Sequence, residues 1–260
     1  MAQNELNIIV YIKALMYETT QEELSSPKES CEFNIFDRTA LECGFRLRNE
    51  FGGRVDVLSI GTHSSVRIMR ETLAMGADRA VLLSDPALER SDSPTLTRAL
   101  SATIKSMMPF DLLLFCSSPQ NDDIVQVESQ VTNMIDIPLI TDIHSIVRVS
   151  YGLQIQCKKN HVWETCETSL PAALAITPEV FKSRDTGMFG IAAALEDLEV
   201  DILTLSDLDL EKVKIKPEKQ EKAIASVIAL PTLTKGHNSK TKGDKTAKQT
   251  DELIQYLHTI

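Results

Sequence analysis

The sequence predicts an α/β protein: a doubly wound parallel sheet with an antiparallel ribbon and a C-terminal arm. Through the first half of the chain, short apolar runs alternate with amphipathic segments, which is typical of strands joined by right-handed helical crossovers. From residue 140 to residue 167 the helical spacing disappears and the pattern becomes strand-like, interrupted by a turn at residues 150–152. These observations predict the sheet and the ribbon.

Each expected strand is a short run of apolar residues bounded by turn-forming residues. The expected strands of the sheet cover residues 7–12, 55–60, 80–83, 112–116, 173–177 and 200–205. The run at 112–116 is apolar without a break, as in parallel strands that are covered on both faces. We therefore expect helices on both faces of this strand.

The expected helices carry apolar residues three or four positions apart. They cover residues 36–49, the segment from Val66 to Gly76, the segment that opens at Ser93 and the segment that follows residue 121. Gly52 and Gly76 are expected to end the first two helices, because glycine is favoured where a helix stops. Ser93 is expected to cap the third helix, with Pro94 in its first turn.

We expect the chain to divide into residues 1–210, an α/β domain, and residues 211–260, a linker and arm. Residues 178–190 carry no periodic pattern, and a loop of that length in a compact domain is usually functional or disordered. Residues 235–245 are a polar tract typical of a solvated linker. The helix expected at residues 250–257 is too short to be stable alone in water, so it should dock on another surface.

Composition argues against several classes of function. The 260 residues carry a formal net charge of −10, which argues against nucleic acid as the main partner. No apolar run is long enough to span a membrane, and the first six residues lack the pattern of a signal peptide, so we expect a cytoplasmic protein. The five cysteines and five histidines are scattered, without the spacing of a metal site or a catalytic triad.

The segment after residue 116 is the best candidate for a ligand site. A buried strand there breaks into a polar loop and re-enters a helix, an arrangement that directs backbone N–H groups at whatever lies above the strand end. Asp122 and Asp123 stand where residues that cap a helix are expected. The segment predicts a seat for a phosphate, although many strand-loop-helix units bind no ligand.

A series of short motifs runs in order along the chain. The motifs are IVYIK at residues 9–13, NIFD at 34–37 with AL at 40–41, AMGADR at 74–79, FDL at 110–112, DD at 122–123 with QV at 126–127, IP at 137–138 with Thr141, LPA at 170–172, SR at 183–184 and GI at 190–191. In number, order and spacing they resemble the beta subunit of electron transfer flavoproteins, from about residue 7 to residue 210.

The resemblance implies a Rossmann-like sheet of the adenine nucleotide alpha hydrolase type that binds AMP, while the redox FAD belongs mainly to the alpha subunit. Carried over by position, the implied AMP contacts are Tyr11 through its backbone, Asn34, Asp37, Ile60, Ser117, Ser118, Asp122, Asp123, Ile124, Val125, Gln126 and Val127. The last three would direct their amides at the phosphate.

A structural role is the alternative for several of these residues. Asn34, Asp122 and Asp123 have side chains that often do nothing more than cap a helix. Tyr11 and Ile60 would then be residues at the edge of the core, of which only the backbone matters.

The same resemblance assigns residues 178–190 to the loop that reaches partner dehydrogenases. Arg184 and Met188 are the implied partner-binding residues, with Met188 at the position of the apolar anchor. An exposed methionine can adapt to an irregular pocket. A contact between Met188 and the protein's own core is the equally weighted alternative.

Several positions depart from the family's pattern. Glu128 and Ser129 stand where the family usually has Gly-Pro, and we expect Glu128 in the first turn of its helix, where an inward-pointing carboxylate would repel a phosphate. The Gly-Ile pair is followed by residues 192–196 in place of a basic cluster, and Met16 and Tyr17 replace a proline and an aspartate. The departures indicate a divergent member with an altered choice of partner.

The resemblance implies an electron carrier subunit that itself catalyses no bond chemistry. It would form a heterodimer with the alpha subunit, accept electrons from an acyl-CoA dehydrogenase through FAD held with that subunit, and pass them toward a membrane quinone reductase. One alternative is an electron-bifurcating type with FAD in the beta subunit and NADH beside it. Another is a non-redox, nucleotide-binding regulatory protein.

Overall fold

The computed structural model describes residues 5–13, 15–18, 29–88, 91–116, 122–149, 152–159, 162–178, 180–185, 187 and 199–208. Of the predicted site residues, Ser117, Ser118 and Met188 lie outside the described residues, as do residues 211–260, for which a linker and an arm are predicted. For residues 122–126 the backbone is described and the side chains are not.

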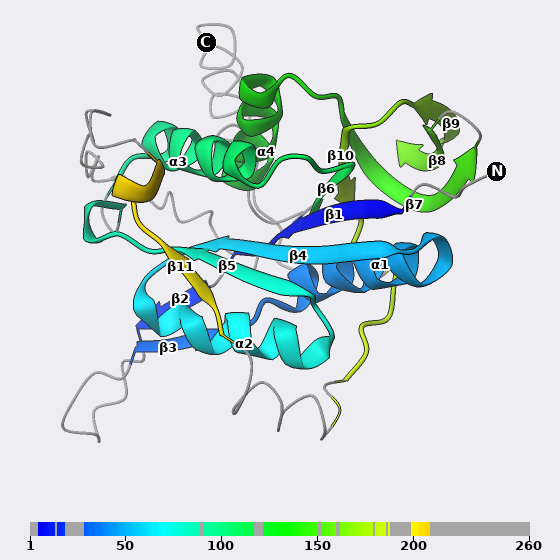
Figure 1. Ribbon diagram of the computed structural model, residues 1–260. Coiled ribbons are helices and arrows are strands. Elements are labelled where there is room, and N and C mark those ends of the chain that lie inside the picture. Colours follow the sequence, from blue (N-terminus) through cyan, green and yellow to red (C-terminus); the bar gives the residue numbers. More distant parts are fainter. Residues whose placement is uncertain are drawn as a thin grey trace, which may run out of the picture. The chain divides into compact units, whose positions relative to one another are not determined.

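A large central sheet organises the described part of the chain (Figure 1). Its strands are β1 (Leu6–Tyr11), β4 (Gly53–Ile60), β5 (Arg79–Leu83), β6 (Leu112–Cys116), β7 (Leu139–Val149), β8 (Gly152–Lys159), β9 (Val162–Thr168), β10 (Ala172–Ile176) and β11 (Asp201–Leu203). They lie in the order β11-β5-β4-β1-β6-β10-β7-β8-β9. Neighbouring strands from β11 to β7 are parallel, and β7, β8 and β9 form an antiparallel ribbon. The predicted α/β fold, with its parallel sheet and ribbon, is confirmed.

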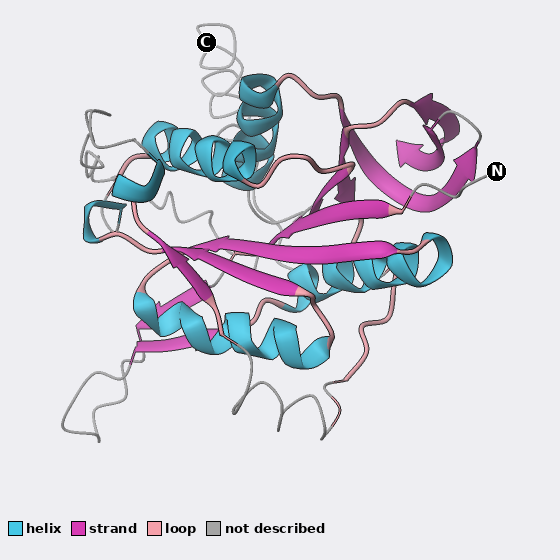
Figure 2. Cartoon of the chain, viewed as in Figure 1, coloured by secondary structure: helices cyan, strands magenta, loops and turns pink. Residues whose placement is uncertain are grey.

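Helices cover both faces of the parallel strands (Figures 1 and 2). Helices α1 (Ile35–Phe51) and α2 (Val66–Met75) pack on one face, and α3 (Ser93–Ser106) and α4 (Asp122–Ile135) pack on the other. Since successive strand residues point to opposite faces, Ile8 joins the apolar core under α1 whereas Ile9 joins the core under α3 and α4. The fully buried strands β6 and β10 explain the unbroken apolar runs in their sequences.

The helix ends follow local chemistry, with one correction. Asn34 caps α1, where its side chain accepts a hydrogen bond from the Phe36 N–H at 3.0 Å, and Gly76 ends α2 in the left-handed conformation. The prediction that Ser93 caps α3 is wrong. The cap is Asp92, whose carboxylate accepts the Thr95 N–H at 3.0 Å, so that Ser93 is already the first helical residue.

Two other features differ from the sequence-based expectations. Strands β2 (Leu15–Glu18) and β3 (Glu29–Glu32) form a separate antiparallel pair between β1 and α1 that the sequence did not predict. Helix α4 begins at Asp122, so Asp122 and Asp123 are the first helical residues and do not occupy the cap position.

Candidate functional site

The candidate site lies where the order of the strands changes direction along the chain. From β1 the chain proceeds to β4 and β5 on one side, and then returns to β6 on the other side of β1. Ligands of open α/β sheets bind outside the carboxyl ends of the strands at such a point. We define the switch-point site by four residues near this edge: Tyr11, Asp37, Cys116 and Glu128.

Asp37 belongs to the first turn of α1 and is buried. Its carboxylate accepts a hydrogen bond from the Lys13 N–H at 2.8 Å, which ties the segment after β1 to the start of α1. Burial raises the pKa of Asp37 to about 7, although the Lys13 N–H and the Lys13 charge both act to lower it. The predicted site residue therefore has a structural contact and is partly protonated near neutral pH.

Glu128 lies on the inner face of α4, together with the buried residues Val131, Thr132 and Ile135. Only 2% of Glu128 is exposed, and its Oε1 has no hydrogen-bond partner among the described residues. Burial raises the pKa of Glu128 to about 8, and the nearby Asp37 carboxylate adds to the rise. Glu128 is the seventh residue of α4, so the prediction that it stands in the first turn is wrong.

Tyr11 ends β1 and Cys116 ends β6. The ring of Tyr11 contacts the ring of Phe115 edge to face, with 5.9 Å between centroids. Burial raises the pKa of both the Tyr11 phenol and the Cys116 thiol, and Asp37 and Glu128 raise these pKa values further. Both groups are therefore neutral at physiological pH. None of the four residues of the site carries a positive charge.

Of the predicted site residues, Tyr11 and Asp37 interact electrostatically in the structure, together with Cys116 and Glu128, which were not predicted as contacts. Cys116 was missed because a cysteine inside an apolar strand gives no local signal of a site. Asn34 lies at the same end of α1, but its side-chain oxygen is used by the helix cap. Ile60 and Val127 are partly buried and pack against the core under α3 and α4.

Arg184 is held by contacts within the chain. Its Nε donates to the Glu42 Oε2 at 2.7 Å, and its guanidinium lies 4.6 Å from the centre of the Phe45 ring. Burial by itself would raise the pKa of Glu42, but hydrogen bonds from Arg184 and Arg46 hold that pKa below its usual value. Arg184 therefore anchors its segment to α1, and a contact between Arg184 and a partner is still a prediction.

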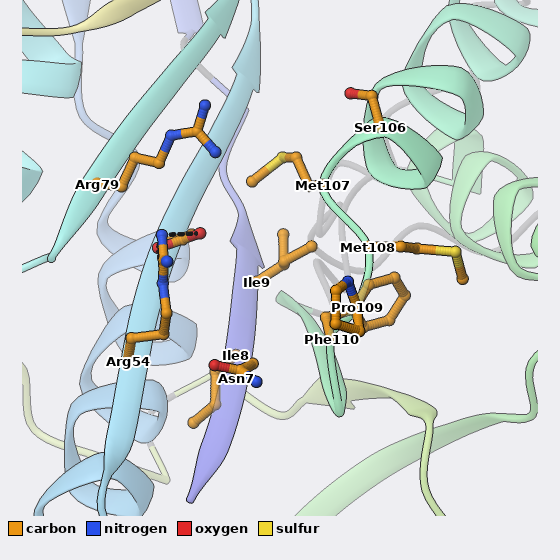
Figure 3. A pocket seen from close by; sticks show the side chains of 11 residues that line it. Asn7, Ile8, Ile9, Arg54, Arg79, Ser106, Met107, Met108, Pro109 and Phe110 are labelled. Carbon is orange, nitrogen blue, oxygen red and sulfur yellow. Dashed lines mark hydrogen bonds and ion pairs between the residues drawn. The ribbon is translucent and has the colours of Figure 1, made fainter.

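A cavity of about 350 Å³ opens at the opposite, amino edge of the sheet (Figure 3). Its lining residues are Asn7, Ile8, Ile9, Arg54, Asp56, Arg79, Ser106, Met107, Met108, Pro109 and Phe110. The Arg54 guanidinium pairs with Asp56 at 2.7 Å, and the Arg79 guanidinium pairs with Asp201 at 2.6 Å. Because both arginines are engaged by carboxylates of the chain, their charges at this cavity are balanced internally.

Within the described residues, no three or more His, Cys, Asp or Glu side chains gather as a metal ion would require. No helix in the same part of the chain has the length and apolar character needed to cross a membrane.

The fold and the switch-point site define a Rossmann-like α/β protein with a candidate ligand site at the carboxyl ends of β1 and β6. The family model described as the electron transfer flavoprotein domain matches residues 28–206. The chain therefore belongs to the electron transfer flavoprotein family, and its resemblance to the beta subunit is confirmed.

Three relatives illustrate the similarity. The electron transfer flavoprotein subunit beta of Thermoanaerobacterium thermosaccharolyticum is 34% identical over 180 residues, which cover 69% of this chain and 68% of that protein. Protein FixA of Azotobacter vinelandii is 33% identical over 55% of this chain and 53% of its own length. The caffeyl-CoA reductase-Etf complex subunit CarD of Acetobacterium woodii is 31% identical over 63% of each chain. These relatives support an electron transfer flavoprotein subunit, and the beta subunits of that family are electron carriers.

Proposed function

We propose that this chain is the beta subunit of a cytoplasmic, heterodimeric electron transfer flavoprotein. It would accept electrons from an acyl-CoA dehydrogenase through FAD held with an alpha subunit and pass them toward a membrane quinone reductase. The observation that carries the proposal is the match of the family to residues 28–206, which include every strand of the central sheet except β1 and every residue of the switch-point site except Tyr11. The name of the relative CarD, which belongs to a caffeyl-CoA reductase complex, supports a partner that acts on an acyl-CoA.

The switch-point site is the proposed binding site of AMP. Helix α4 starts at the carboxyl edge of β6, and the N–H groups of a helix N-terminus suit a phosphate. The amides of Val125, Gln126 and Val127, near the start of α4, are the proposed phosphate contacts, and Ser117, Ser118 and Ile124 are further proposed contacts of the nucleotide. Tyr11, Asn34, Asp37 and Ile60 would border the nucleoside. The buried, unpaired Oε1 of Glu128 is compatible with a ligand that has a hydrogen-bond donor or with a carboxyl that is protonated.

FAD would supply the reversible uptake of electrons, and the proposal places it with the alpha subunit. This chain would then brace that subunit and present residues 178–190 to a dehydrogenase. The ion pair between Arg184 and Glu42 supports this role, because it ties the middle of the segment to α1. Met188 is the proposed apolar contact for the partner.

Co-purification of this chain with its alpha subunit tests the proposal. We expect a complex with the yellow absorbance of flavin, one flavin per heterodimer, and AMP released on acid denaturation. Two flavins per heterodimer would instead support the electron-bifurcating type. A complex without flavin absorbance would contradict electron transfer, and release of a nucleotide alone would favour the regulatory alternative.

A further inference from the structure

Two buried carboxyl groups approach the switch-point site from opposite faces of the sheet. Asp37 comes from α1 on one face, and Glu128 comes from α4 on the other. Both are nearly inaccessible to water, at 6% and 2% exposed. Asp37 has the Lys13 N–H as a partner, whereas Oε1 of Glu128 has none among the described residues. A buried polar atom without a partner is uncommon and calls for an explanation.

Among the described residues, no positively charged group lowers the pKa of Glu128. The groups that interact with it electrostatically are Asp37 from α1, Tyr11 from β1 and Cys116 from β6. Lys13 acts on Asp37. Helix α3 packs along α4 through neutral contacts, Thr97 with Gln130 and Ser101 with Met134, and its charged residues Arg98 and Lys105 are exposed. Within the described part of the chain, burial and the Asp37 carboxylate therefore both disfavour the carboxylate form of Glu128.

The position of Glu128 along α4 places its charge close to the helix N-terminus. Glu128 lies six positions after Asp122, a separation of roughly 9 Å along the axis of an α-helix. Over that distance, through a poorly solvated interior, a carboxylate repels a phosphate bound at the N-terminus much more strongly than it would in water. A protonated carboxyl has no such charge and can donate its O–H to a neighbouring oxygen.

We propose that Glu128 is a specificity-determining residue, which makes the binding of a phosphate-bearing nucleotide at the switch-point site depend on the uptake of a proton. This inference rests on the proposed function, in which AMP occupies the site. Asp37 contributes by favouring the protonated form of its neighbour. Because the pKa of Glu128 is about 8 before any ligand binds, a nearby phosphate raises it further, and the complex takes up a proton over the range in which the free protein has lost it. At the position where the resemblance implies a glycine in other members, this chain thus has a proton-linked control of its ligand.

Calorimetric titration of the full chain with AMP and with adenosine, from about pH 7 to about pH 9.5, tests the proposal. AMP keeps both phosphate charges over this range, because the second pKa of a phosphate monoester is about 6. For the wild-type chain we expect the affinity for AMP to fall by up to about tenfold per pH unit above pH 8. Glu128→Gln should bind AMP with little dependence on pH and more tightly than the wild type at the upper end of the range. Adenosine, which lacks the phosphate, should show little dependence on pH with either protein.

Glu50→Gln is the matched control, because Glu50 is exposed in the last turn of α1. It should reproduce the wild-type pH profile. Parallel AMP profiles for the wild type and Glu128→Gln would overturn the proposal, as would the absence of AMP binding to both proteins.

A second measurement needs no variant and covers the case in which Glu128→Gln fails to fold. Calorimetry of the wild type in buffers of different ionisation enthalpy reports the protons taken up when AMP binds. We expect an uptake that approaches about one proton per AMP near pH 8 to 9, and no uptake would overturn the proposal. Failure of the proposed electron transfer is detected separately, by the flavin absorbance of the complex with the alpha subunit, which none of these titrations uses.

Discussion

The two edges of the parallel sheet handle their carboxyl groups in opposite ways. At the amino edge, Asp56 pairs with Arg54 and Asp201 pairs with Arg79. Arg54, Asp56 and Arg79 border the cavity between β1, β4, β5 and the end of α3 (Figure 3). At the carboxyl edge, Asp37 and Glu128 are buried without an arginine or lysine side chain that forms an ion pair with either of them in the described part of the chain.

Paired and unpaired carboxyl groups have opposite effects on the free energy of unfolding. At the amino edge, the Arg79–Asp201 pair is more than a third exposed on both sides and is worth little, whereas the charge of the buried Asp56 is compensated by its ion pair with Arg54. A buried carboxyl without a counter-charge opposes folding whenever it ionises. Carboxyl groups with strongly shifted pKa values are concentrated at functional sites. For this reason the carboxyl edge is the candidate site, and the paired charges of the amino edge are not.

Replacing Glu128 should give the largest effect and would break the comparison most directly. The pKa of Glu128 in the folded chain is about 8, against 4.5 for its ordinary value, so the stability that the neutral form maintains at low pH is lost as pH rises through this interval. Relative to the wild type, Glu128→Gln should therefore gain about 2 to 4 kcal/mol of unfolding free energy between pH 5 and pH 9. Denaturant unfolding at both pH values measures the gain. If the difference in unfolding free energy between the variant and the wild type is the same at pH 5 and pH 9, Glu128 is not desolvated as the structure indicates.

Asp37→Asn should give a smaller effect in a lower range of pH. Its pKa is raised from 3.8 to about 7, so the wild type loses the corresponding stability between about pH 4 and pH 7, and the variant should gain about 1 to 3 kcal/mol across that range. The side-chain oxygen of the introduced asparagine can still accept the Lys13 N–H. A variant that is less stable than the wild type at pH 8 would indicate that the ionised Asp37 strengthens this hydrogen bond more than burial opposes it.

Arg54→Met tests the amino edge, where we expect a loss of about 1 kcal/mol. Asp56 is buried while its arginine is half-exposed, so removal of the guanidinium leaves a poorly solvated carboxylate without its partner. The effect should be opposite in sign to that of Glu128→Gln at pH 9. Thermal or denaturant unfolding at neutral pH is sufficient, and a gain in stability would remove the distinction between the two edges.

Arg79→Met should have the smallest effect, at most about 0.5 kcal/mol. Both Arg79 and Asp201 are more than a third exposed, and water and salt screen such pairs. The same unfolding measurement, repeated at low and high salt, should show that the small loss decreases as salt is added. A loss larger than that of Arg54→Met would mean that β11 depends on this pair for its place at the end of the sheet.

Local pattern predicted most of the fold. Short segments of sequence contain the patterns that predicted these elements. The patterns are the apolar runs of β1, β4, β5, β6 and β10 and the apolar residues three or four positions apart in α1 to α4. Gly52 and Gly76 end their helices with φ of 79° and 114°, and glycine adopts such positive φ values without the steric cost that a side chain adds. The motifs at residues 9–13 and 74–79 likewise predicted the family that residues 28–206 confirmed.

Two local decisions required knowledge of the tertiary structure. Asp92 and Ser93 are both good cap residues, and the choice of Asp92 depends on how the chain enters α3 after residue 91. The pairing of β2 with β3 joins segments whose own sequences carry no clear strand pattern, so their partner decides their structure.

The sequence determined some features of the candidate site, and the tertiary structure determined the others. The sequence by itself determined that a candidate site follows the strand that ends at residue 116 and that an acid stands at position 128, whereas the pairing of β1 with β6 comes from the sheet order of the structure. Only the tertiary structure decided that Glu128 is buried on the inner face of α4 and shares an apolar environment with Asp37 of α1. Burial and electrostatic coupling depend on distances between segments far apart in the chain, and no pattern within either segment contains those distances.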